Sequence, residues 1–223
     1  MNRFLIRGII TLALLASVGM VTAANLVTNG GFETPTAIDP FTPNMNTGLT
    51  GWSISPGNID LISTLWNPPT GGGAQSIDLS GCARATLSQD IATTPGDSYK
   101  LTFALAGNPY PQTNTVRKVA VIWGNDAPII RSFDTAGRSY PSDMGWTTVT
   151  DIPSFQASTN PTTLKFQDVS ENDNLCVGVA LDNIDVEQQQ VTPSPEFPSV
   201  ALPVALIVGI LGAILFIKST KQN

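Results

Sequence analysis

The sequence contains no histidine, and this absence removes several kinds of chemistry together. Neither a Ser-His-Asp nor a Cys-His nucleophile can be assembled, and no histidine-ligated zinc or haem site can form. Cysteine is nearly absent as well, with only Cys82 and Cys176 present. In an exported protein, two cysteines most simply form one disulfide, although two free thiols are the alternative. Such a bridge would join an early strand region to the last strand.

Basic residues are also scarce. Between residues 25 and 199 there are seven Lys or Arg, against all seventeen Asp and Glu of the chain, which leaves this part with a net charge of −10. A charge of that sign argues against binding nucleic acid or anionic lipid head groups. It is compatible with calcium and with neutral glycans as partners.

The first 24 residues have the pattern of a secretory signal peptide. Arg3 and Arg7 form a positive start, an apolar run follows from residue 8 to residue 21, and small residues allow cleavage after Ala23 or Ala24. The alternative interpretation is an uncleaved membrane anchor. The chain is therefore predicted to be exported.

The C-terminal part predicts attachment to a membrane. Residues 187–199 form a polar, proline-rich linker, and residues 200–217 carry no charge. As a helix, this run would span about 27 Å, close to the hydrocarbon thickness of a bilayer. Lys218 and Lys221 lie in the following tail, 218–223, which the positive-inside rule places in the cytoplasm. A buried C-terminal helix of a soluble domain is the alternative.

Residues 25–186 have the size of one domain, and their pattern predicts an all-β fold. Turn-forming residues recur about every eight to twelve positions, which is typical of a sandwich or barrel of antiparallel strands. We expect a jelly-roll β-sandwich of about ten strands. The expected strands are 51–55, 59–63, 75–79, 85–91, 98–106, 116–124, 129–133, 147–152, 162–168 and 176–186.

The opening segment Asn25–Thr34 (NLVTNGGFET) resembles the start of galactose-binding-like jelly-roll carbohydrate-binding modules. The later segments resemble the choice-of-anchor C surface proteins, which are similar to a plant cell-wall protein family of otherwise unknown function. The segments that carry this resemblance are 51–52, 58–61, 66, 75–81, 88–91, 94–96, 101–103, 106–109, 144–146 and 180–184. The sequence departs from that pattern at Gly178-Val179, where the family usually has Gly-Pro.

The resemblance implies a calcium site. In galactose-binding-like sandwiches the opening strand meets the last strand, and a carboxylate from each often holds calcium together with backbone carbonyls. Carried over to this sequence, the two carboxylates are Glu33 and Asp182, and the turn at residues 29–31 supplies carbonyl oxygens of the kind that calcium prefers. The alternative is that both carboxylates only accept hydrogen bonds from exposed turns.

The motif Pro195-Glu196-Phe197, followed by the apolar run and the basic tail, resembles the PEF-type sorting signal of archaeal surface proteins. This resemblance implies an archaeosortase, a membrane transpeptidase, as a processing partner. The enzyme would cut near the motif and could replace the helix with a lipid. A plain transmembrane anchor is the alternative.

The candidate ligand-binding residues are two aromatics in loop-like sequence, Trp66 and Tyr110. Sugars present apolar C–H faces, so their sites combine a flat aromatic ring with polar groups, here Asn108 and Asp60. The other three tryptophans, at positions 52, 123 and 146, are predicted to lie in the core.

These patterns predict a non-catalytic module at the cell surface that binds a glycan of the cell envelope or of an extracellular matrix. A structural or adhesion protein without sugar binding is the alternative, because fold does not determine function. A glycoside hydrolase using Asp60/Asp78 or Asp182/Asp185 is a third hypothesis, which would need two carboxylates facing each other in a cleft. An exposed aromatic beside polar groups on a concave face would favour the first hypothesis, and burial of all four tryptophans the second.

Overall fold

The computed structural model describes residues 24–171 and 174–189. The sorting motif at 195–197, the apolar run at 200–217 and nearly all of the expected signal peptide lie outside this range. A search of the described residues finds no helix that is long and apolar enough to cross a membrane.

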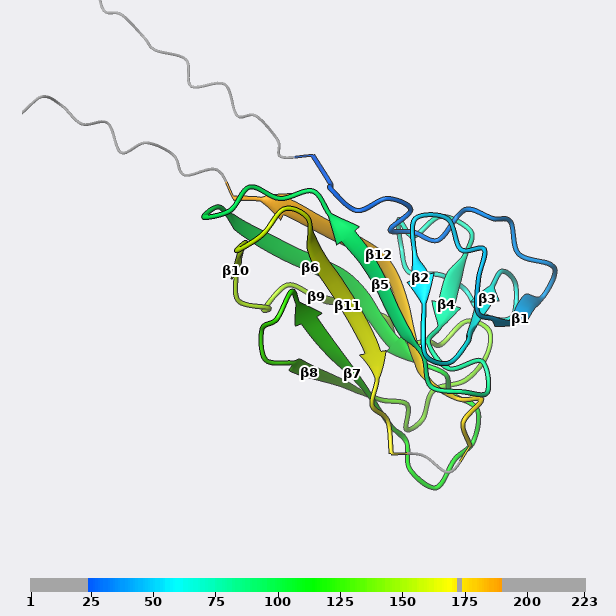
Figure 1. Cartoon of the computed structure of the whole chain (residues 1–223). Helices are drawn as coiled ribbons and strands as arrows, with labels where there is room; N and C mark the ends of the chain where they lie inside the picture. The colour runs from blue at the N-terminus through cyan, green and yellow to red at the C-terminus, as the bar shows by residue number, and fades with distance from the viewer. Residues whose placement is uncertain (1–23, 172–173, 190–223) are drawn as a thin grey trace, which may run out of the picture. The chain divides into compact units, whose positions relative to one another are not determined.

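Two antiparallel β-sheets make up the described domain (Figure 1). The larger sheet has seven strands in the order β1-β3-β4-β12-β6-β10, with β9 also paired to β6. Its strands are β1 (Phe41–Met45), β3 (Ile59–Ile62), β4 (Ser76–Asp78), β6 (Ser98–Gly107), β9 (Thr147–Val149), β10 (Phe155–Gln156) and β12 (Val179–Gln188).

The smaller sheet has five strands in the order β2-β5-β11-β7-β8. Its strands are β2 (Ser53–Ile54), β5 (Thr86–Ile91), β7 (Val116–Trp123), β8 (Ile129–Asp134) and β11 (Thr162–Asp168). Successive strands often switch from one sheet to the other, which is the connectivity of jelly-roll folds. The predicted all-β antiparallel sandwich is therefore confirmed.

The period-2 pattern of the sequence explains how the sandwich closes. In β6, Tyr99, Leu101 and Phe103 are almost fully buried, and in β11 Leu164 and Phe166 are fully buried. Alternate residues of a strand face opposite sides, so these five side chains face the layer between the sheets. The Phe103 and Phe166 rings meet there edge to face with centroids 5.2 Å apart, joining the two sheets.

All ten expected strands are present, and two further strands were not expected. β1 contains Pro43 and an Asn44 with a φ of 55°, and its pairing with β3 is irregular there. Proline and asparagine are depleted in strands, so the sequence of β1 reads as a loop. β10 has only two residues and follows Pro153 too closely to show an alternating pattern.

The predicted disulfide between Cys82 and Cys176 is present in the structure. It links the turn after β4 to the segment that leads into β12, across a sequence separation of 94 residues. The last strand is predicted to begin at Cys176, but β12 begins at Val179. The backbone groups just before Val179 form hydrogen bonds with side chains and loops instead of with a neighbouring strand. The Gly178 amide, for example, donates to the Asp78 carboxylate.

The first and last described segments lie side by side. The Leu26 amide donates to the Val186 carbonyl at 2.9 Å, and the Asn25 side chain bonds to backbone atoms of Ile184 and Val186. Just after β12, the Gln189 amide donates to the Ser98 carbonyl of β6. The chain therefore enters and leaves the domain along the same strand (Figure 1).

Candidate functional site

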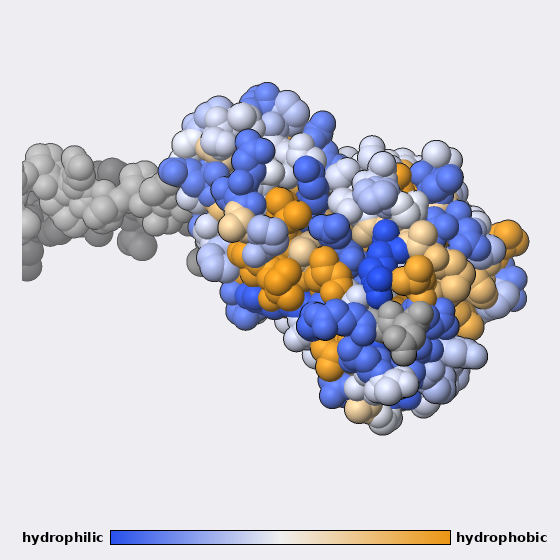
Figure 2. Space-filling view, turned by 60° about the horizontal axis from the view of Figure 1, so that its bottom comes forward, coloured by the Kyte–Doolittle hydropathy of each residue, from blue (hydrophilic) through white to orange (hydrophobic). Residues whose placement is uncertain are grey.

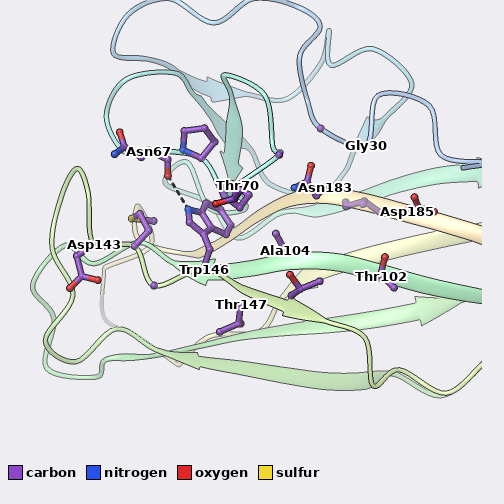
Figure 3. A pocket seen from close by; sticks show the side chains of 18 of the residues that line it. Gly30, Asn67, Thr70, Thr102, Ala104, Asp143, Trp146, Thr147, Asn183 and Asp185 are labelled. Atoms are coloured by element: carbon purple, nitrogen blue, oxygen red, sulfur yellow. Dashed lines mark hydrogen bonds between the residues drawn. The ribbon is translucent and has the colours of Figure 1, made fainter.

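A groove of about 770 Å³ lies on the outer face of the seven-stranded sheet. Its floor includes Thr102 and Ala104 of β6 and Thr148 of β9, which pairs with Ala104. The two β6 residues point outward because Leu101 and Phe103, which alternate with them, point into the core. Figure 3 shows Thr102 and Ala104 below the loop that carries Asn67 and Thr70.

Loops form one wall of the groove, and residues of β12 and of the opening segment form the other. The loop wall consists of residues 67–71 together with residues 142–146. Opposite it lie Asn183 and Asp185 of β12, next to Asn25 and Gly30 from the opening segment. The lining is rich in hydroxyl, amide and carboxylate groups, and it contains neither Lys nor Arg.

Trp146 lies in the middle of this groove (Figure 3). Its side chain is partly exposed, and its indole Nε1–H donates to the Asn67 carbonyl at 2.9 Å. The prediction that Trp146 lies in the core is therefore only partly right, because the side chain packs against the core but is not buried in it. Trp146 follows Gly145, which has a φ of 65°, and lies in the loop just before β9, not in the strand itself.

Two contacts hold the loop wall together. The Asn67 amide donates to the Pro141 carbonyl at 2.8 Å, so the loop at 67–71 is tied to the β8–β9 loop. The rings of Trp66 and Tyr140 stack with centroids 6.0 Å apart and an angle of 4° between their planes. The two loops therefore form one packed unit on the outer face of the sheet.

Trp66 is part of that packing and does not line the groove. Its side chain is only 1% exposed, its Nε1–H donates to Ser76 Oγ at 2.8 Å, and Tyr140 stacks on it. This placement corrects the expectation that Trp66 contacts a ligand, because no ring face remains for a sugar. The proline-rich loop that suggested exposure instead folds back over β4 and buries the indole.

The other three predicted ligand residues lie together in a second cavity. Asp60, Asn108 and Tyr110 line a cavity of about 530 Å³. We call it the tyrosine pocket and define it by Phe41, Asp60, Leu65, Tyr110, Tyr140 and Val177, which all line it. The sequence thus grouped three residues of one cavity, although Tyr140 was not anticipated.

Asn108 is committed to protein partners inside this pocket. Its Nδ2 donates to Asp78 at 2.7 Å, and its Oδ1 accepts hydrogen bonds from the Tyr110 amide and the Tyr140 hydroxyl. With only 6% of the residue exposed, its role is to position the two tyrosines. Burial raises the pKa of the Tyr140 hydroxyl to about 12, so this donor stays protonated.

Asp60 and Asp78 face each other in register on β3 and β4, but they do not form an open pair. Burial raises the pKa of Asp60 to about 6, although its hydrogen bond from the Asn44 amide opposes this effect. Burial also raises the pKa of Asp78, which is completely inaccessible and bonded to Asn108 and Ser80. A substrate has no access to Asp78, so the two carboxylates do not flank a cleft.

The structure brings Glu33 and Asp182 together around the glycines at 72 and 73. A Cβ on Gly73 would lie 2.3 Å from Glu33 Oε1, and a Cβ on Gly72 would lie 2.3 Å from Asp182 Oδ2. Glu33 Oε1 also accepts hydrogen bonds from the amides of Ala74 and Gln75. The glycine turn can approach both carboxylates only because it has no side chains there.

The Asp182 carboxylate is suited to a cation. Oδ1 accepts the Asn183 amide, but Oδ2 is buried with no hydrogen-bond partner. Burial raises the pKa of Asp182 to about 8, with a further contribution from the negative charge of Glu33. A hard cation would satisfy the buried oxygen, so these residues fit calcium. Within the described ranges no three Asp, Glu or Cys side chains converge, so most other ligands would have to be carbonyls or water.

The curated relative Halomucin of Haloquadratum walsbyi (strain DSM 16790 / HBSQ001) is 28% identical to this chain over 203 residues. The match covers 87% of this chain but only 2% of Halomucin. This chain therefore spans a small fraction of the length of that relative.

The chain is similar to several solved structures at low sequence identity. A Fischerella sp. TAU cyclase is 19% identical, with a TM-score of 0.47, and the match covers 75% of this chain and 98% of the cyclase. TmCBM61, solved in complex with β-1,4-galactotriose, is 15% identical with a TM-score of 0.44, covering 75% and 100%. A family 35 carbohydrate-binding module of Clostridium thermocellum is 14% identical with a TM-score of 0.42, covering 60% and 90%.

The model of one protein family matches residues 25–187, which are nearly all of the described domain. The chain belongs to the family described as protein of unknown function (DUF642).

Proposed function

We propose that the domain is a non-catalytic carbohydrate-binding module whose groove holds a neutral glycan chain. The observation that carries this proposal is Trp146, an aromatic side chain partly exposed in a groove that is otherwise polar. It is the arrangement that distinguishes a binding surface from a structural sandwich with all its tryptophans buried.

The groove offers both kinds of contact that a sugar needs. The indole of Trp146 provides an apolar surface for the C–H face of a ring. The hydroxyls of Thr102 and Thr148 and the amide of Asn183 provide donors and acceptors for sugar hydroxyls. Because the floor is formed by two adjacent strands, β6 and β9, the site suits an extended chain better than an isolated ring.

The charge of the groove selects against acidic polysaccharides. Asp143 and Asp185 are its charged lining residues, and Asp143 is paired with Arg138 at 2.9 Å. The domain as a whole is strongly acidic. An anionic glycan would meet like charge, so the ligand class is a neutral polysaccharide.

A polysaccharide panel tests this function. We expect the purified chain to be retained in affinity electrophoresis by at least one neutral polysaccharide and by none that is rich in uronate or sulfate. Serum albumin run in the same gels controls for sieving. Retention by acidic polymers alone would overturn the ligand class, and failure to bind any polysaccharide would favour a structural role in the envelope.

The cell surface is the setting that fits this module. The N-terminal sequence has an export pattern, and the disulfide is of the kind that persists outside the cytoplasm. Similarity to Halomucin is in keeping with a surface role. We propose that the chain is a choice-of-anchor C type surface protein held at the membrane by residues 200–217, or by a lipid after archaeosortase processing at Pro195-Glu196-Phe197.

We further propose that Glu33 and Asp182 bind calcium, and we expect the cation to stabilise the fold. At a concentration about 100-fold above the Kd, calcium should raise the melting temperature by about 5–10 °C relative to the chain in chelator. Asp182→Asn should abolish this increase, since it removes the charge of the buried carboxylate. Differential scanning calorimetry measures both effects.

The matched control for the calcium experiment is Asp126→Asn, a change of an exposed aspartate in the β7–β8 turn. It should leave the calcium-dependent increase intact. An equal melting temperature with calcium and with chelator would show that the two carboxylates do not form a metal site.

A further inference from the structure

We propose that the tyrosine pocket is a second ligand site, separate from the groove, and that it takes a single neutral sugar ring carrying a methyl substituent, such as a 6-deoxy or O-methyl sugar. This inference concerns a different cavity and does not depend on the function proposed for the groove.

The loop unit separates the two cavities. Leu65 and Tyr140 line the tyrosine pocket, whereas Asn67 and Met144, their near neighbours in sequence, line the groove. The stacked rings of Trp66 and Tyr140 lie within the same loop unit. One ligand therefore cannot run straight from the groove into the pocket, and the two cavities bind independently.

The composition of the tyrosine pocket differs from that of the groove. Its wall is mainly apolar, with Phe41, Leu65 and Val177 joined by the Cys82–Cys176 disulfide. Its volume of about 530 Å³ lies within the range of about 300–1,000 Å³ usual for small-molecule sites. Such a wall matches a methyl group, whereas a hydroxymethyl group would lose its hydrogen bonds to water on entering.

Two residues, Asp60 and Tyr110, would orient a sugar ring in the pocket. Asp60 brings a carboxylate with only 9% of the residue exposed, which can accept a sugar hydroxyl. Tyr110 is 52% exposed and its backbone amide donates to Asn108, so its ring is available for stacking at a position that the backbone holds. The lining contains neither Lys nor Arg, so the pocket offers an anionic ligand no counter-charge.

Exposed hydrophobic side chains lie at and beside this pocket. Among the described residues, the exposed large hydrophobic side chains are Ile38, Tyr110, Ile130 and Leu175. Tyr110 lines the pocket, and Leu175 lies between two lining residues, Asn174 and Cys176. Figure 2 shows hydrophobic side chains gathered in patches on an otherwise hydrophilic surface.

Calorimetric titration with two simple sugars tests the proposal. The full chain, kept in solution by a detergent without a sugar head group, is titrated with L-rhamnose and with its 6-hydroxylated counterpart, L-mannose, which carries no methyl group. We expect the 6-deoxy sugar to bind about 5- to 150-fold more tightly, because its competitor must bury one more polar hydroxyl.

Three variants assign the binding to the pocket. Tyr110→Ala should weaken binding of the 6-deoxy sugar by at least about tenfold, which corresponds to the loss of one aromatic stack. Tyr110→Phe should retain binding, because the ring remains. Trp146→Ala should leave this binding unchanged, so failure of the groove hypothesis and failure of this one give different results.

The opposite results would overturn the inference. These are no binding of the 6-deoxy sugar, equal binding of both sugars, or binding of the 6-deoxy sugar that survives Tyr110→Ala. Because Tyr110 is exposed, Tyr110→Ala should melt at the same temperature as the parent chain, and a loss of binding then reports on the pocket itself.

Discussion

Replacing Trp146 with alanine is expected to abolish retention on the polysaccharide that the parent chain binds. The indole is the large apolar surface in a groove of polar side chains, and a ring stacked on it would lose both the stacking and the burial. Aromatic side chains bury about 150–250 Å² each, so the affinity should fall by about 10- to 100-fold. Affinity electrophoresis of the parent and the variant measures the change.

Two further variants separate stacking from loop structure. Trp146→Phe keeps a ring but loses the Nε1–H that donates to the Asn67 carbonyl, so it should retain part of the affinity. Tyr110→Ala removes an exposed aromatic outside the groove and should retain all of it. If Trp146→Ala bound as well as the parent chain, the groove would not be the glycan site.

Replacing Trp66 with alanine is expected to act on stability, with a loss of about 3–5 kcal/mol in the free energy of unfolding. The indole is 1% exposed, so its removal leaves a cavity between the loop unit and β4. The variant also leaves Ser76 Oγ without its donor and Tyr140 without its stacking partner. Urea unfolding followed by tyrosine fluorescence and circular dichroism measures this loss.

The comparison with Trp146→Ala makes the second prediction specific. Trp146 is partly exposed, so its replacement should cost much less stability than the replacement of Trp66. Trp66→Phe should fall in between, because a smaller ring still fills most of the space. A Trp66→Ala variant with unchanged stability and reduced glycan retention would instead restore the original assignment of Trp66 to the ligand site.

Trp66 is predicted to bind ligand and is buried, whereas Trp146 is predicted to be buried and lines the groove. This difference shows how far the sequence alone could be interpreted. Strand positions were predictable from alternation, as in β6 and β11, because every second residue faces the core. Trp66 follows no such pattern, since a loop that folds back on its own sheet leaves no periodic signal. Trp146 is predicted to lie in the core because it adjoins a strand, but it is on the same side as Thr148, which pairs with the outward-facing Ala104.

The Glu33–Asp182 pair and the tyrosine pocket differ in how much of them could be predicted from the sequence. The pairing of Glu33 with Asp182 came from a family resemblance, and the structure places the two residues around one glycine turn. The grouping of Asp60, Asn108 and Tyr110 rested only on residue type. That Tyr140 joins them depends on the stacking of two loops about 75 residues apart, which no local pattern encodes.

The course of the chain at β12 has a consequence for any longer polypeptide that contains this domain. Since Leu26 pairs with Val186, the segments before and after the sandwich depart from neighbouring points. The domain then projects to one side of the polypeptide. Each added copy of the domain increases the end-to-end length of the polypeptide by little more than the width of two paired strands. Repeated copies would crowd many grooves onto a short length of backbone, and weak single contacts with a polysaccharide would combine into strong adhesion.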